Sequence, residues 1–239
     1  MILIPTLLCL SAAAAVTTAP TAAAAAPLDV NQASYSAGLS FGAQLRAAGL
    51  TDSLSMDSLK RGIEAGVSGT PMSATDQQRL SSWVHSARAN LAQANQAAGG
   101  EFLDRNGKAA GVVTTASGLQ YRIVKGGDSK AASPQANDQV TVNYRGLLLD
   151  GREFDSSYKR GQAATFAVGG VIKGWREALQ LMKPGAQWEI YVPAALAYGA
   201  NPPPGTGIGP DSTLKFELEL LKVTTPSLNS SPSAHSGGH

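Results

Sequence analysis

The sequence predicts an α+β protein. An all-α N-terminal domain with one long helix is expected to precede an antiparallel β-sheet wrapped around one short α-helix. Two patterns support this class: apolar residues recur at steps of three and four between residues 28 and 106, and alternate with polar ones in short runs from residue 119 to 223. A single helical pattern, near residues 174–182, interrupts the second region. The chain has 239 residues, enough for two small domains with flanking segments.

The N-terminal residues 1–26 are expected to be a secretory signal peptide. An apolar run from Ile2 to Val16 is followed by an alanine tract from Ala22 to Ala26 that offers small residues for cleavage. The run is too short for a transmembrane helix, which needs about 20 apolar residues, so we expect no stable membrane span. A basic start is missing, because no Lys or Arg precedes Arg46. Two explanations of the missing basic start remain open: the protein starts upstream of Met1, or the segment is a weak signal peptide. The expected location is periplasmic or secreted, with outer-membrane association left open.

Composition argues against several classes of function. The chain carries 19 basic and 17 acidic residues, a net charge of +2, without a basic stripe, so no nucleic-acid partner is expected. The single cysteine, Cys9, lies in the leader, which leaves the mature domains without a thiolate nucleophile or disulfide. The three histidines, His85, His235 and His239, do not form a metal-ligand pattern. We therefore expect neither a metal nor another cofactor.

Residues 27–106 are predicted to form a helical dimerisation domain. A first helix follows the potential cap Asn31 and ends at Gly49, and a second follows the cap Ser55. The third and longest opens at Ser73 with a capping-box-like arrangement, and is expected to be interrupted at Gly99-Gly100.

A second copy of the chain is the expected partner of these helices. About 70 helical residues make a thin core for an independent domain. The pairs Gly38/Gly42 and Gly62/Gly66 each share a helix face, where small residues permit close approach of another helix. We therefore predict a homodimer through the N-terminal helices. A self-contained three-helix bundle is the alternative.

Residues 107–118 are expected to form a linker to a β-rich domain over residues 119–223. Alternation is clearest from Leu214 to Leu220, where leucines and Phe216 alternate with charged residues. Asp150-Gly151 is typical of a tight hairpin turn. The tail, residues 224–239, is rich in Ser, Gly and Pro without apolar periodicity, and is predicted to be disordered.

Five segments of the β-rich domain, in their order, resemble the FK506-binding-protein (FKBP) type of peptidyl-prolyl cis-trans isomerase. They are VTVNYRG, DGREFDSS, TFAVGGVIKGWREALQLM, GAQWEIYVPAALAYG and STLKFELELLKV. The helical segment, with YSAGLSFGAQLR, is similar to the dimerisation region of the bacterial Mip and FkpA group. The resemblance implies an enzyme that acts on proline-containing polypeptides without metal, cofactor or covalent intermediate, and that binds macrolides of the FK506 or rapamycin type.

The resemblance also assigns roles to individual residues. Trp175 would form the floor of an apolar pocket, and Asp155 and Tyr198 its polar, catalytic rim. The substrate-binding walls would be Tyr144, Phe154, Val171, Ile172 and Phe216, with Ile208 on the loop after Tyr198. Ala164 stands where relatives often carry a larger side chain, so one wall is expected to be open. Without the family order, Trp175, Phe154 and Phe216 would be interpreted as ordinary core aromatics, and Asp155 as a turn or cap residue.

Two functions are compatible with this interpretation. The first is an exported isomerase that accelerates rotation about X-Pro bonds during protein folding, by desolvating and binding the twisted amide. The second is a dimeric, holdase-like periplasmic chaperone in which isomerisation is incidental.

Overall fold

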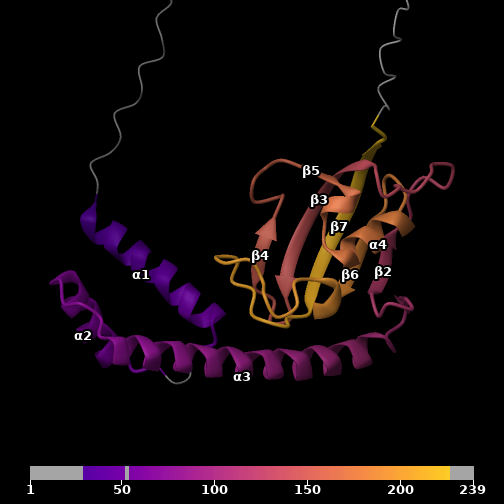
Figure 1. The fold of residues 1–239 in the computed structure, drawn as a ribbon. Coiled ribbons are helices and arrows are strands. Elements are labelled where there is room, and N and C mark those ends of the chain that lie inside the picture. Colours follow the sequence, from indigo (N-terminus) through magenta and orange to yellow (C-terminus); the bar gives the residue numbers. More distant parts are fainter. Residues whose placement is uncertain (1–28, 52–53, 227–239) are drawn as a thin grey trace, which may run out of the picture. The chain divides into compact units, whose positions relative to one another are not determined.

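The computed structural model describes residues 29–51 and 54–226 (Figure 1). The predicted signal peptide and most of the predicted tail lie outside the described residues. The described part of the chain divides into two units, with the boundary between Gly38 and Leu39. Its α-helices are α1 (Val30–Ala47), α2 (Met56–Val67), α3 (Ala74–Asn106) and α4 (Lys173–Leu181), with short 3-10 turns at Val168–Gly170 and Ala194–Leu196. No helix among the described residues is both long and apolar enough to cross a bilayer.

The strands follow the long helix and form one antiparallel sheet, which confirms the α+β class. They are β1 (Val112–Thr114), β2 (Gln120–Lys125), β3 (Gln139–Leu148), β4 (Glu153–Ser156), β5 (Ala164–Ala167), β6 (Gln187–Val192) and β7 (Leu214–Thr224). Their order is β1-β2-β6-β7-β3-β4, and β5 also pairs with β3. Strand β1 lies within the segment 107–118 that was predicted to be a linker, and it pairs with β2.

Side-chain caps set the helix starts. Ser55 accepts a hydrogen bond from the backbone N–H of Ser58 at the start of α2. Ser73 accepts one from the N–H of Asp76 and donates its own hydroxyl to the Asp76 carboxylate, so both predicted caps are confirmed. The prediction for α1 was wrong: the cap is Asp29, whose carboxylate accepts from two backbone N–H groups, because it precedes the first turn of a helix that already includes Asn31.

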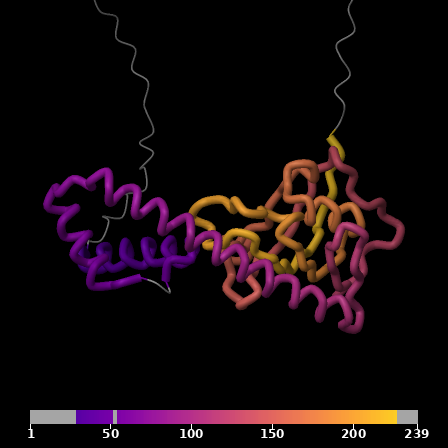
Figure 2. The backbone as a smooth tube through the Cα atoms, turned by 60° about the horizontal axis from the view of Figure 1, so that its bottom comes forward, coloured from indigo at the N-terminus to yellow at the C-terminus, as the bar shows by residue number. Residues whose placement is uncertain are grey.

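Helix α3 runs unbroken for 33 residues, so the predicted interruption at Gly99-Gly100 was wrong (Figures 1 and 2). The structure explains the glycine at position 99 by tight packing and not by a break in the helix. Gly99 is buried, and a Cβ built on it would collide with the hydroxyl oxygen of Thr213, whereas Gly100 is exposed with open space around it. Gly99 thus permits the backbone of α3 to approach the segment before β7.

Helix α4 packs against the sheet and closes the core. Its buried residues are Gly174, Trp175, Ala178 and Leu179. Gly174 allows the close approach, because a Cβ there would lie 2.5 Å from a methyl group of Val192 on β6. The spacing of these residues places one face of the helix on the alternating inward side chains of β3, β6 and β7.

The close packing of α3 against Thr213 can be tested at the neighbouring glycines Gly99 and Gly100. We expect Gly100→Ala to raise the free energy of unfolding by about 0.5–1 kcal/mol, because alanine favours a helix over glycine at an exposed site. Gly99→Ala should instead lower it by about 1–3 kcal/mol, since the new methyl group overpacks against buried Thr213. Urea unfolding of both variants measures the difference. Equal stabilisation by both would contradict the close approach.

Candidate active site

A cavity of about 250 Å³ opens beside the N-terminal end of α4. Four strands, the turn before α4 and the loop after Ala194–Leu196 supply its walls. The lining residues are Tyr144, Phe154, Asp155, Phe166, Gly170, Val171, Ile172, Trp175, Tyr198 and Phe216. The lining is therefore mostly aromatic or aliphatic, with one carboxyl group and two phenol hydroxyls, which is typical of a small-molecule or side-chain binding site.

Trp175 is the centre of this cavity. Its side chain is 4% exposed, and three rings meet it edge-on: Tyr144, Phe166 and Phe216, with centroid distances of 5.2, 5.7 and 5.3 Å and interplanar angles of 82–89°. Such edge-to-face contacts favour one orientation of the ring, because the positive edge of one aromatic meets the negative face of another. The indole is thereby fixed as a rigid apolar floor. Its Nε1–H is buried without a hydrogen-bond partner in the described part of the chain.

A second layer of rings and aliphatic side chains completes the walls. Phe154 on β4 packs edge-on against Phe216 on β7 at 5.6 Å. This contact depends on Gly146 in β3, where a Cβ would come within 2.6 Å of the Phe154 ring. Val171 and Ile172 precede α4 and add aliphatic surface.

A triad of polar groups lies on one side of the cavity. The Tyr144 hydroxyl donates to Oδ2 of Asp155, and the Arg160 guanidinium donates to Oδ1 of Asp155 and, at 2.7 Å, to the Tyr144 oxygen. Burial raises the pKa of Asp155, but the hydrogen bonds from Tyr144 and Arg160 outweigh it and hold the pKa below its ordinary value. The carboxylate therefore stays ionised at neutral pH.

Tyr198 supplies the other polar group of the rim. Its side chain is 36% exposed, and its hydroxyl makes no hydrogen bond within residues 29–51 and 54–226. Burial, followed by the negative charge of Asp155, raises the pKa of Tyr198. The phenol is consequently protonated at neutral pH and can donate a hydrogen bond to a ligand.

Comparison of the sequence with known proteins identifies the family of the chain. Residues 130–221 match the family model of the FKBP-type peptidyl-prolyl cis-trans isomerases, and residues 30–123 match the model of the domain amino-terminal to such isomerases. The "Outer membrane protein MIP" of Legionella longbeachae is 41% identical over 86% of this chain and 90% of its own length. The chain belongs to the FKBP-type peptidyl-prolyl cis-trans isomerase family.

Further relatives extend the match. The FKBP-type 22 kDa isomerase of Escherichia coli K12 is 41% identical over 80% of this chain and 94% of its own length. The isomerase Mip of Coxiella burnetii is 56% identical, but this match spans only 52% of that relative. The crystal structure of FkpA from Escherichia coli superposes with a TM-score of 0.60 and 33% identity, over 83% of this chain and 98% of that one.

The structure brings together eight of the nine site residues that the sequence predicted for this FKBP-type isomerase, namely Tyr144, Phe154, Asp155, Val171, Ile172, Trp175, Tyr198 and Phe216. Ile208 is not among the lining residues. It is 5% exposed and borders a different hollow, beside Pro202–Pro204 and Arg88.

Sequence reasoning missed three contributors to the site. Phe166 lines the cavity from β5, two residues after Ala164, which is not among the lining residues. Gly170 lines it beside Val171, and Arg160 holds the carboxylate of Asp155. Phe166 was visible as an apolar residue in a short strand, but nothing in its spacing distinguished a pocket wall from core.

The lowered pKa of Asp155 makes the free energy of unfolding depend on pH. A carboxyl whose folded pKa lies below its unfolded value of about 3.9 stabilises the fold above that value, and this stabilisation is lost as pH falls through the folded pKa. Asp155→Asn should therefore be less stable than wild type at pH 7, and the difference should vanish in strong acid. Chemical unfolding at several pH values measures this, with Asp104→Asn, an exposed carboxylate of α3, as the control. A difference that does not depend on pH would contradict the assignment.

Proposed function

We propose that the aromatic cavity binds the proline ring of an X-Pro segment and accelerates rotation about the preceding peptide bond without covalent chemistry. The observation that carries this proposal is the buried indole of Trp175 surrounded edge-on by three rings. Amide resonance sets a barrier of about 18–20 kcal/mol to this rotation. A planar amide is more dipolar than the twisted one, so an apolar site that excludes water disfavours the planar forms selectively.

The polar rim would hold the twisted amide. The Tyr198 hydroxyl is protonated and without a partner in the described chain, which suits it to donate to the carbonyl of the substrate. Asp155 is held by Tyr144 and Arg160, and would orient the rim rather than accept a proton. Proline-containing polypeptides are the proposed substrates. Macrolides of the FK506 and rapamycin type are the proposed competing ligands, because they present apolar rings and carbonyls to such a pocket.

We also propose that the enzyme acts on exported chains, in the periplasm or outside the cell. The support is the apolar leader and alanine tract of residues 1–26, together with the name of the Legionella longbeachae relative, which places that protein in the outer membrane.

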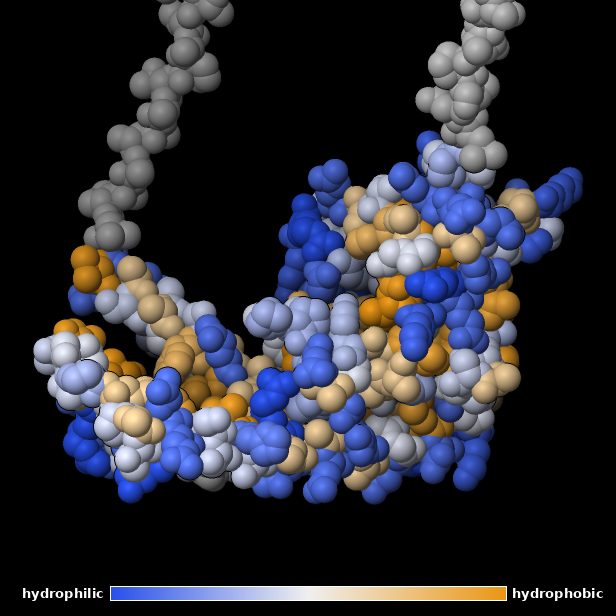
Figure 3. All heavy atoms as spheres, viewed as in Figure 1, coloured by the Kyte–Doolittle hydropathy of each residue, from blue (hydrophilic) through white to orange (hydrophobic). Residues whose placement is uncertain are grey.

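The exposed surfaces of α1 and α2 support a homodimer. Large apolar side chains lie at least half exposed on both helices (Figure 3). They are Val30, Tyr35, Leu39, Met56, Ile63 and Val67. A Cβ built on Gly38, Gly42, Gly62 or Gly66 meets nothing within 4 Å, so these backbones are open to another helix. Exposed apolar area of this kind favours a partner surface.

The same surfaces support the second function, a holdase-like chaperone. Apolar side chains on paired helices would bind unfolded segments while the aromatic cavity isomerises their prolyl bonds. Suppression of aggregation of an unfolded client that lacks proline separates this activity from isomerisation. Loss of the chaperone effect together with the isomerase effect in Tyr198→Phe would argue for a single function.

The rim hydroxyl is tested by Tyr198→Phe. We expect a fall in kcat/KM on a prolyl tetrapeptide of about two- to tenfold, which corresponds to loss of one hydrogen bond of about 0.5–1.5 kcal/mol in the transition state. Tyr158→Phe is the matched control, since that phenol is 52% exposed and lines no part of the cavity. Wild-type activity in Tyr198→Phe would remove the proposed role.

The dimer is tested by Ile63→Glu. A charge in the proposed interface should convert the protein to a monomer in light scattering, because burying an unpaired carboxylate is costly. Arg61→Glu, an exposed position of α2 outside the apolar set, should stay dimeric. A monomeric wild-type protein would eliminate the proposed dimer.

A further inference from the structure

The loop that follows Tyr198 is held by helix α3. We call residues 199–211 the rim loop, because it begins directly after the rim residue Tyr198. Its two ends meet: the N–H of Asp211 donates to the carbonyl of Gly199 at 2.8 Å. Gly199 is also tied to the body of the domain, since its own N–H donates to the carbonyl of Ala194. The position of Asp211 is therefore linked through one hydrogen bond to the residue next to Tyr198.

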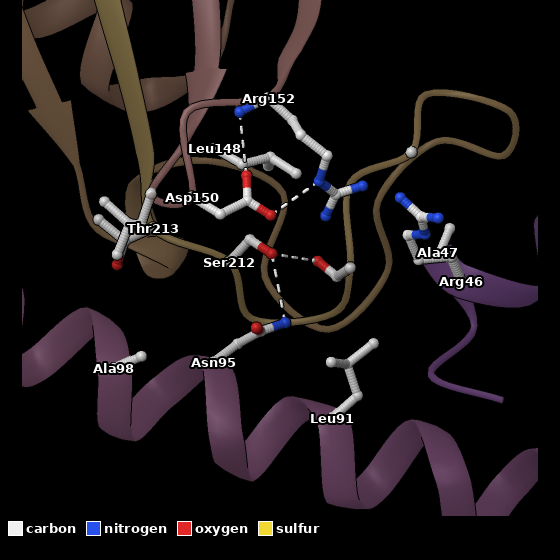
Figure 4. A pocket seen from close by; sticks show the side chains of 13 residues that line it. Arg46, Ala47, Leu91, Asn95, Ala98, Leu148, Asp150, Arg152, Ser212 and Thr213 are labelled. Atoms are coloured by element: carbon white, nitrogen blue, oxygen red, sulfur yellow. Dashed lines mark hydrogen bonds and ion pairs between the residues drawn. The ribbon is translucent and has the colours of Figure 1, made fainter. Parts of the chain in front are cut away.

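Two side chains of α3 contact the C-terminal end of the rim loop, next to the hydrogen bond between Asp211 and Gly199. Gln96 donates its amide to the carboxylate of Asp211 at 2.9 Å, and Asn95 donates to the carbonyl of Pro210 at 2.7 Å. Asn95 also donates to the hydroxyl of Ser212 at 3.3 Å. Figure 4 shows Asn95 directed from the helix toward Ser212.

Close packing accompanies these hydrogen bonds. A Cβ built on Gly209 would lie 2.9 Å from the Asn95 amide nitrogen and 3.2 Å from a methyl group of Leu91, so a larger residue there would displace the Asn95 amide. Gly99, one turn further along α3, makes the matching approach to Thr213. Leu91, Asn95 and Gly99 follow each other at steps of four, which places them on one helix face.

Asp211 has an unusual backbone. With φ of 52°, it is the one non-glycine residue in the described segments with positive φ. This left-handed conformation is unfavourable unless surrounding contacts compensate, and it is less unfavourable for Asp and Asn than for other residues. Gln96 supplies such a contact from a separate element of the chain.

We propose that Gln96 and Asn95 are positioning residues for the prolyl pocket. They fix Pro210 and Asp211, which fix Gly199, and this chain of contacts sets where the Tyr198 phenol stands at the rim. Neither residue lines the pocket. Helix α3 would thereby tune the activity of the isomerase domain as well as join it to α2. The proposal rests on the proposed role of Tyr198 in isomerisation.

A charge exchange between the two elements tests the contact. In Gln96→Glu, two carboxylates face each other, and the hydrogen bond to Asp211 is lost. We expect kcat/KM on a prolyl tetrapeptide to fall about two- to tenfold, the equivalent of one hydrogen bond. Adding Asp211→Asn should restore the rate, because the new amide at position 211 donates to the new carboxylate at position 96, and asparagine still tolerates the left-handed backbone. The exchange also restores any stability that this contact supplies, so the rates are compared at a temperature at which all variants are fully folded.

The matched control is Gln93→Glu, which introduces the same change one turn earlier at an exposed position of α3. It should leave the rate unchanged. A second readout does not depend on activity: the backbone amide resonance of Tyr198 in NMR spectra should shift in Gln96→Glu and return in the double variant.

The outcomes separate the two proposals. An active wild type with an equally active Gln96→Glu variant and an unmoved Tyr198 resonance overturns the positioning role alone. An inactive wild type overturns the proposed isomerase function, and the Tyr198 resonance then still decides whether α3 positions the rim. A loss that the double variant does not restore also counts against the proposed contact.

Discussion

The edge-on packing of three rings against Trp175 is the contact on which the site depends. Tyr144 of β3, Phe166 of β5 and Phe216 of β7 all contact this one residue of α4. The sheet must wrap around this helix for the rings to meet, so the fold and the pocket have a common core. Aromatic side chains here serve both as buried hydrophobic mass and as the walls of a cavity. The polar rim follows from the same contact, because Tyr144 presents its ring to the indole and its hydroxyl to Asp155.

Glycines set the distances at which the other elements join this core. Gly174 lets α4 approach β6, Gly146 makes room for the Phe154 ring, and Gly99 brings α3 against the segment before β7. Each stands where a methyl group would meet a buried neighbour, and each lies in a regular element where glycine costs about 0.5–1 kcal/mol relative to alanine. Their cost is offset by packing that a larger residue would prevent. Helix α3 is consequently bound to the isomerase domain through much of its second half, where Phe102 also packs on Tyr191 at 5.5 Å.

Much of this arrangement could be predicted from the sequence. Period-two alternation located β2, β3, β6 and β7, caps at Ser55 and Ser73 located two helix starts, and the order of the segments identified most of the pocket. The errors have physical causes. Gly99-Gly100 was predicted to interrupt the helix because a glycine pair lowers helix propensity, and only the tertiary contact with Thr213 shows that Gly99 permits a close approach. Ile208 lies on the rim loop after Tyr198 as expected and is buried in the same core cluster as Trp175, but it does not line the cavity. Arg160 and Phe166 are assigned to the site by tertiary contacts that no local pattern encodes.

The central claim is that proline binds against the indole of Trp175 and that rotation occurs there. Exchange NMR on an X-Pro peptide with a catalytic amount of the protein, combined with a titration that follows the Trp175 indole N–H, tests it most directly. That N–H has no hydrogen-bond partner in the described chain, so its resonance should report an arriving ligand. The account predicts cis–trans exchange peaks and a saturable shift of this resonance with the same peptide. Exchange without any shift at Trp175, or a shift without exchange, would contradict it.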